Sequence, residues 1–321
     1  MSLLSLPLEL RELIIELALF TSQPPLAPSK CNRSDLNDIK YRAWRHRTYY
    51  EQSPVSCPSL LLVNRHLAVE TQSILTRQPT QYILNIAIVN EVDLFPTWVS
   101  VPRLNTRIST LYADIQLHGH ILSKPDARAQ VGCGGHLGFQ WSFYALLERF
   151  LQYGPLGDQG PDPSCPRDIT IDTLILDFSS AETSLPAPPA EVDYRRWWRR
   201  QHFLDRGRRS EQTEDVLVQY RARPEWMAEY LAKEMTGLLN MGYYHAKYGM
   251  ILYEQIGRIQ ILVEGQLVKA MDLGKSLKEL HFHDAQETLG HLWPRELRVP
   301  AFKEWLRKTK KRRTDDWMID I

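Results

Sequence analysis

The sequence ISTLYADIQLHGHI, residues 108–121, alternates apolar and polar side chains along its length. Successive side chains of a β-strand point to opposite faces of its sheet, so the alternation predicts a strand with one face in a core and the other in solvent. Three residues of the polar face, Asp114, His118 and His120, have the types and spacing of metal ligands, but we favour a solvated face because all of that side is polar. The apolar positions are Ala113, Ile115, Leu117 and Ile121, and the polar positions are Asp114, Gln116, His118 and His120.

The rest of the chain mixes further strands with helices, and the two do not alternate regularly. This pattern predicts the α+β class, with a mixed body of strands and helices, rather than a doubly wound sheet. No repeat of 20 to 50 residues occurs, which argues against a propeller or a solenoid. The predicted strands cover residues 82–89, 108–121, 169–178 and 277–282, with a hairpin of 259–263 and 266–271 joined at Glu264-Gly265. The predicted helices cover residues 6–20, 139–153, 194–204, 225–240, 243–255 and 300–308, with one more between Pro58 and Pro79.

The composition is that of a globular protein with little net charge. Of 321 residues 43% are hydrophobic, and 39 Lys and Arg stand against 38 Asp and Glu, so the net charge argues neither for nor against a polyanionic partner. The four cysteines are scattered and are interpreted as free thiols of a reducing compartment. The N-terminus has no basic leader, and the most apolar run, residues 83–89, is too short to cross a bilayer. We therefore expect a protein of the cytoplasm or the nucleus without a membrane span.

Two regions are predicted. Residues 1–80 form a helical module interrupted by an insert at 21–57, which contains four prolines and few aliphatic residues. Residues 81–321 form the α+β body, which ends in a basic tail.

Two motifs lie in the first region: LPLELRELI at residues 6–14, and LLLVNR at residues 60–65 followed by Glu70. They resemble the F-box-like proteins of filamentous fungi, whose pattern is an LP-x-E-L/I-R helix, a variable loop and an LLxVNR…E helix. The resemblance covers residues 3–77, about a quarter of the chain. It implies a module that docks on the Skp1 adaptor of a ubiquitin ligase, while the remainder recruits a substrate. Carried over by position, the partner-binding residues are Leu6, Pro7, Leu10, Ile14, Leu62, Val63 and Arg65.

A second interpretation of these helices needs no partner, because two amphipathic helices can simply pack on the body. The two interpretations differ in one observable: docking requires the leucine-rich face to be exposed as an apolar patch. If Leu10, Ile14, Leu62 and Val63 are buried within the chain, docking fails for those residues.

No catalytic or cofactor motif is found, so we expect a non-enzymatic protein-interaction role without a cofactor. The glycine-rich residues 132–138 lack the spacing of a dinucleotide fingerprint and the lysine of a P-loop, and residues 281–284, HFHD, have their aspartate one position too early for a binuclear metal site. An enzyme of unrecognised type would require a deep pocket with convergent polar groups.

An arginine- and tryptophan-rich segment offers an alternative function. Like-charged arginines four residues apart on a helix repel, and either nearby acidic residues or a polyanion would offset that repulsion. Arginine and tryptophan also provide phosphate contacts and base stacking, so the alternative is a nucleic-acid-associated nuclear protein that uses residues 194–209. The candidate polyanion-binding residues are Arg195, Arg196, Trp197, Trp198, Arg199 and Arg200.

A second basic cluster at residues 307–313 has six basic residues in seven. It is typical of a nuclear localisation signal, and equally of a solubilising tail. The candidate signal residues are Lys308, Lys310, Lys311, Arg312 and Arg313.

Overall fold

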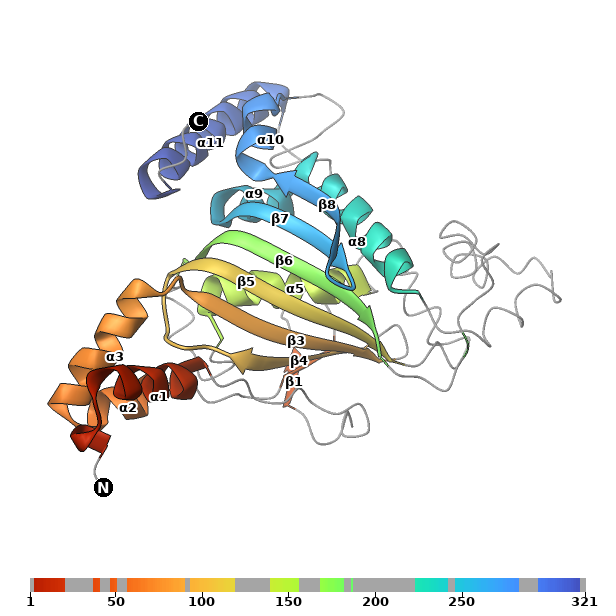
Figure 1. Ribbon diagram of the computed structural model, residues 1–321. Coiled ribbons are helices and arrows are strands. Elements are labelled where there is room, and N and C mark those ends of the chain that lie inside the picture. Colours follow the sequence, from red (N-terminus) through yellow and green to blue (C-terminus); the bar gives the residue numbers. More distant parts are fainter. Residues whose placement is uncertain are drawn as a thin grey trace.

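An eight-stranded mixed sheet forms the centre of the computed structural model, with the N-terminal helices beside one end of it (Figure 1). The structure describes residues 3–20, 37–40, 47–50, 57–89, 93–118, 139–155, 168–181, 186, 223–241, 246–282 and 294–317. The strand order is β1-β2-β4-β3-β5-β6-β7-β8. The strands are β1 (Asn37–Lys40), β2 (Arg47–Tyr50), β3 (Gln81–Val89), β4 (Asp93–Ser100), β5 (Arg107–His118), β6 (Thr170–Ser180), β7 (Ile256–Val263) and β8 (Gln266–Asp272).

The four central strands β3, β5, β6 and β7 are parallel, and β4 and β8 flank them in antiparallel orientation. Parallel neighbours need long connections, and three of the described helices lie in them. Helix α5 (Phe139–Tyr153) lies between β5 and β6, and α8 (Pro224–Leu239) and α9 (Ala246–Gln255) lie between β6 and β7. The mixed sheet with its irregular alternation of helices and strands confirms the predicted α+β class.

One face of the sheet holds the main core. In Figure 1 helix α5 lies behind the strands, and buried side chains of α5, α8 and α9 pack there against the strands. The alternation predicted in β5 is confirmed, because Leu111, Ala113, Ile115 and Leu117 are buried in this core while the intervening side chains remain partly exposed. The opposite face of β5 carries Thr110, Tyr112, Asp114, Gln116 and His118, and beside Gln116 this face includes the buried Ala87 of β3 and Phe95 of β4.

The N-terminal helices enclose a small core of their own. The 3-10 turn η1 (Leu3–Ser5) precedes α1 (Leu8–Phe20), and α2 (Cys57–Val63) leads into α3 (Arg65–Arg77). The single helix predicted between Pro58 and Pro79 is divided at Asn64, whose extended backbone caps α3 and whose side chain accepts a hydrogen bond from His66 N at 2.7 Å. The small core contains the buried residues Ile15, Leu19, Leu67, Ile74 and Leu75.

Several sequence expectations need correction. Residues 277–282 are not a strand: the first three of them lie in helix α10 (Leu273–Glu279), where Asp272 caps the first turn by accepting from Lys275 N at 3.0 Å. Strand β4 was not predicted. The insert 21–57 contributes β1 and β2, and β2 pairs with β4 of the body, so the two regions do not divide cleanly at residue 80.

The C-terminal helix α11 (Arg295–Trp317) is far longer than the predicted 300–308, so the basic cluster is helical rather than a tail. No helix in the described part of the chain is both long and apolar enough to span a bilayer.

Candidate functional site

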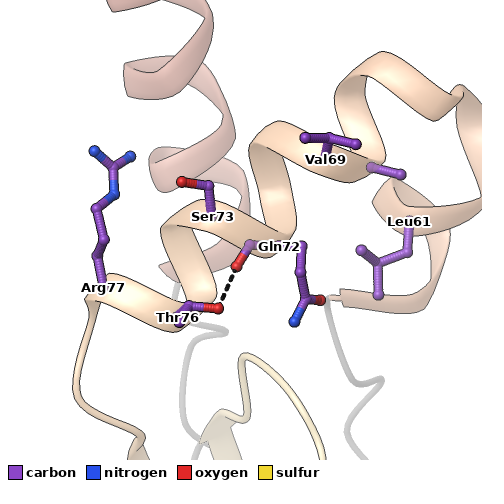
Figure 2. Close-up of a pocket in the computed structure, with 7 residues that line it drawn as sticks. Leu61, Val69, Gln72, Ser73, Thr76 and Arg77 are labelled. Atoms are coloured by element: carbon purple, nitrogen blue, oxygen red, sulfur yellow. Dashed lines mark hydrogen bonds between the residues drawn. The ribbon is translucent and has the colours of Figure 1, made fainter.

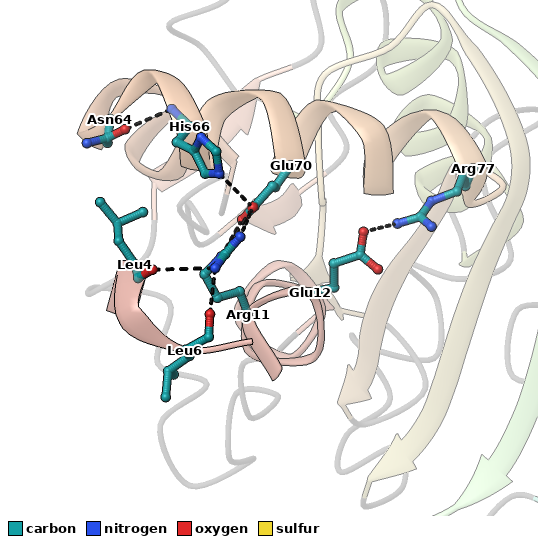
Figure 3. A network of polar contacts seen from close by, with 8 residues as sticks. All are labelled: Leu4, Leu6, Arg11, Glu12, Asn64, His66, Glu70 and Arg77. Atoms are coloured by element: carbon teal, nitrogen blue, oxygen red, sulfur yellow. Dashed lines mark hydrogen bonds and ion pairs between the residues drawn. The ribbon is translucent and has the colours of Figure 1, made fainter. Parts of the chain in front are cut away.

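The two sequence motifs meet in a buried ion pair. Arg11 of α1 places Nη2 2.6 Å from Glu70 Oε1 of α3, and both side chains are about nine-tenths buried (Figure 3). Arg11 Nε donates to both Glu70 oxygens at 3.1 and 3.2 Å, and Arg11 Nη1 donates to Leu6 O at 2.5 Å. One guanidinium therefore joins α1, α3 and the turn before α1, which explains the arginine and the glutamate of the motifs as structural residues.

Electrostatics reinforce this arrangement. The hydrogen bonds from Arg11 hold the pKa of the Glu70 carboxyl below its usual value, so Glu70 is ionised at neutral pH. His66 Nε2 lies 3.4 Å from Glu70 Oε1, and at the other end of α3 Arg77 Nη2 donates to Glu12 Oε1 at 2.9 Å. These contacts fix α1 against α3 and so fix which side of α1 faces outward.

The outward side of α1 is the leucine stripe. Leu10 is 48% exposed, Ile14 41% and Leu17 63%, whereas the buried residues of α1 are Ile15 and Leu19. The interpretation that the stripe packs on the body is therefore wrong. We call the large exposed aliphatic side chains of η1 and of helices α1, α2 and α3 the exposed leucine set. Its members are Leu4, Leu8, Leu10, Leu13, Ile14, Leu17, Leu62, Val63 and Val69.

The remaining predicted partner-binding residues have mixed exposure. Leu62 and Val63, at the end of α2, are 84% and 67% exposed, and Pro7 and Arg65 are also exposed. Leu6 is partly buried, and its carbonyl group accepts the hydrogen bond from Arg11. Six of the seven predicted partner-binding residues are therefore exposed at the surface.

An open hollow lies beside α3 on the same module (Figure 2). Leu61 of α2 and Val69 of α3 are the large apolar side chains that line it. Thr76 and Gln72 also line it, and the Thr76 hydroxyl donates a hydrogen bond to Gln72 O at 2.7 Å within α3. The hollow lies next to exposed apolar side chains, and Arg77 is the one titratable residue among the described residues that line it.

Sequence reasoning missed part of this surface. Leu4, Leu8, Leu13, Leu17 and Val69 are as exposed as the predicted residues but were not carried over from the family motif. A signal was present, because α1 is apolar on more than one side, and a short helix cannot bury all sides against one neighbour.

The C-terminal basic cluster is integrated in the fold. Arg313 is 1% exposed, and its guanidinium donates to Tyr253 O at 2.6 Å, Ile256 O at 2.9 Å and Gly257 O at 3.4 Å, where α9 passes into β7. Burial lowers the pKa of Arg313 to about 10, which still leaves it charged at neutral pH.

The other residues of this cluster lie nearer the surface. Arg312 pairs with Asp168 at 2.7 Å, and Lys308 lies 3.4 Å from Glu304. The predicted signal residue Arg313 is therefore structural, while Lys308 and Lys311 are exposed. Nuclear localisation through this cluster stays a prediction.

Other candidates fall outside the described residues. These are the arginine–tryptophan segment (Arg195, Arg196, Trp197, Trp198, Arg199 and Arg200), His120 and the glycine-rich residues 132–138. His118 is described; burial lowers its pKa and the carboxylate of Asp114 acts in the opposite sense. Within the described ranges, no group of three or more His, Cys, Asp or Glu side chains is arranged to hold a metal ion.

The sequence matches no protein-family model, and neither a curated protein nor a solved structure matches it.

Proposed function

We propose that this protein is a non-enzymatic interaction protein whose N-terminal helices dock on a partner of the Skp1 type, so that the body can present a second protein to a ubiquitin ligase. The single observation that carries the proposal is the exposure of the leucine set, on helices that the Arg11–Glu70 pair holds in place. Isolated exposed leucines are ordinary, but nine large aliphatic side chains exposed together on η1, α1, α2 and α3 form the kind of apolar surface that marks a protein-interaction site.

The burial pattern also supports a module with a binding side. The small core beneath it is filled by five buried residues, so the exposed set is not needed for packing within the module. Rigid presentation lowers the entropy lost on binding, because the backbone does not have to become ordered.

The binding free energy that these side chains can contribute follows from their exposed fractions. Complete burial of one such side chain contributes about 1.5–3 kcal/mol. Leu62 and Val63 are mostly exposed in the free chain, so most of this burial free energy is available when a partner covers them. Losing both would cost about 3 kcal/mol, which corresponds to roughly 100-fold in affinity.

The test is a binding titration of the full chain against purified Skp1. We expect Leu62→Ser with Val63→Ser to weaken binding roughly 100-fold and leave the melting temperature unchanged. The matched control is Leu267→Ser with Val268→Ser on β8, where both side chains are 59% exposed but lie outside the module. Absence of binding by the unmodified chain, or equal loss in the two variants, would refute the proposal.

A further inference from the structure

Strand β8 forms one edge of the sheet and is open to solvent along most of its length (Figure 1). It is the last strand in the order, and among the strands that the structure describes it pairs only with β7. The five successive residues from Gln266 to Ala270 are exposed, and Met271 is the buried one of its seven described residues. Leu267 and Val268 are each 59% exposed, so another molecule can reach this part of the edge.

The backbone of β8 has hydrogen-bonding groups that β7 does not use. In a sheet the N–H and C=O groups of a strand point alternately to its two sides, so an edge strand presents a row of them to solvent. Many natural edge strands are protected by proline or by several charged side chains. Between Gln266 and Met271 there is no proline, and the sole charged residue is Lys269. This edge is therefore a template on which another strand can pair.

The apolar side chains of β8 restrict which strand can pair there. The register skips Val268, because Ile261 of β7 lies opposite Lys269 and Leu262 lies opposite Leu267. This bulge leaves Val268 without a partner on β7, next to the equally exposed Leu267. Two adjacent exposed apolar side chains favour apolar side chains on the incoming strand.

Lys269 adds a requirement for charge. Its side chain is exposed, and none of the acidic residues that the structure describes forms an ion pair with it. Opposite charges on neighbouring strands stabilise their pairing, whereas like charges directly opposite each other destabilise it. The edge therefore prefers an incoming strand that carries a carboxylate opposite Lys269.

We infer that β8 binds an extended segment of another protein as an additional strand of the sheet, with apolar side chains and a carboxylate opposite Lys269. In this mode of recognition main-chain hydrogen bonds provide affinity, and side chains at alternate positions provide specificity. A second copy of the chain fits the edge less well, because antiparallel pairing about the middle residue of β8 would set Lys269 opposite Lys269. Binding at β8 does not depend on the docking proposal, because β8 lies in the body and the exposed leucine set in the N-terminal helices.

The experiment measures binding of a synthetic peptide to the full chain by calorimetry. The peptide alternates valine and threonine around one central glutamate, and two further versions are N-methylated at one or the other set of alternate residues. Pairing with an edge uses the N–H groups on one side of the incoming strand, so one methylated version should lose binding and the other should retain it. No binding of the unmethylated peptide, or equal binding of the two methylated versions, would overturn the inference.

Charge reversal on both partners tests the contact with Lys269. We expect Lys269→Glu to weaken binding of the glutamate peptide about fivefold and to bind better a peptide with lysine in the central position. The control is Lys303→Glu, which changes an exposed lysine of α11 and should bind both peptides as the unmodified chain does. Equal effects of the two substitutions would contradict a contact at β8.

Hydrogen exchange followed by mass spectrometry locates the bound peptide. Exchange should slow in β8 and stay unchanged in α1, and Leu267→Ser with Val268→Ser should weaken binding, whereas Leu62→Ser with Val63→Ser should not. Slower exchange in α1 instead would place the peptide on the exposed leucine set and overturn the inference. A free chain that sediments as a dimer with β8 already protected would assign the edge to a second copy, which would also overturn it.

Discussion

Replacing Arg313 with methionine tests how the C-terminal helix is held. The side chain is 1% exposed and donates to three carbonyl oxygens around the end of α9, two of them at 2.6 and 2.9 Å. A hydrogen bond to a charged group contributes about 1.5–3 kcal/mol, so the two short bonds represent roughly 3–6 kcal/mol. Methionine removes the cost of burying a charge, which offsets part of this loss. We expect a net loss of about 3 kcal/mol.

The assay is urea unfolding followed by circular dichroism, with thermal melting as a second probe. With an unfolding entropy of about 2.1 cal/mol/K per residue, a loss of this size corresponds to a fall in melting temperature of about 4–5 °C for a chain of 321 residues. Lys311→Met is the control, because Lys311 is exposed on the same helix and its replacement should stay within about 0.5 kcal/mol. A loss below about 1 kcal/mol for Arg313→Met would refute the view that this arginine closes the end of α9.

Three further predictions concern packing, pH and capping. In α9, a Cβ on Gly249 would clash with the backbone oxygen of Leu238, so Gly249→Ala should destabilise the protein by about 1–3 kcal/mol in thermal melting. Gly274→Ala, where the nearest atom to the added Cβ lies 3.3 Å away, should be neutral or slightly stabilising. The Glu70 pKa is lowered by hydrogen bonds from Arg11, so its stabilisation is present above the ordinary pKa of 4.5 and is lost as pH falls through the lowered value; hydrogen exchange of α1 should accelerate in acid, and Glu70→Gln should abolish that pH dependence. Removing the cap of α10 with Asp272→Ala should cost about 1 kcal/mol in chemical denaturation, and an unchanged midpoint would contradict its capping role.

The elements that were predicted correctly are those whose local order of apolar and polar residues matches their burial in the fold. The alternation around Ala113 and Ile115 reports a strand between a core and a polar face, and Glu264-Gly265 reports a tight hairpin turn because both residues have positive φ. Strand β4 escaped prediction because Pro96 interrupts its pattern, and a proline ordinarily argues against a strand inside a sheet. Residues 277–282 were misassigned because the apolar Leu277, Leu280 and Phe282 outweighed the cap at Asp272.

The candidate sites show a different limit. The exposed side of α1 was ambiguous because both sides are apolar, and only the pairing of Arg11 with Glu70, 59 positions apart, decides which side turns outward. The polar side of residues 108–121 was interpreted as a solvated strand face, and no local pattern indicates that Asp114 lies beside Asp177 of β6, because the two residues are distant in sequence. Strand register brings them together, and register is a property of the assembled sheet rather than of any local pattern.

The separate small core of the N-terminal helices has a consequence for the lifetime of the chain. Because only five buried side chains form this core, it contributes little folding free energy, and these helices should unfold before the central sheet does. A partner that covers the exposed leucine set would stabilise the folded helices by its binding free energy. Copies that remain alone would then expose cleavable backbone more often, and proteases would remove them in preference to assembled ones.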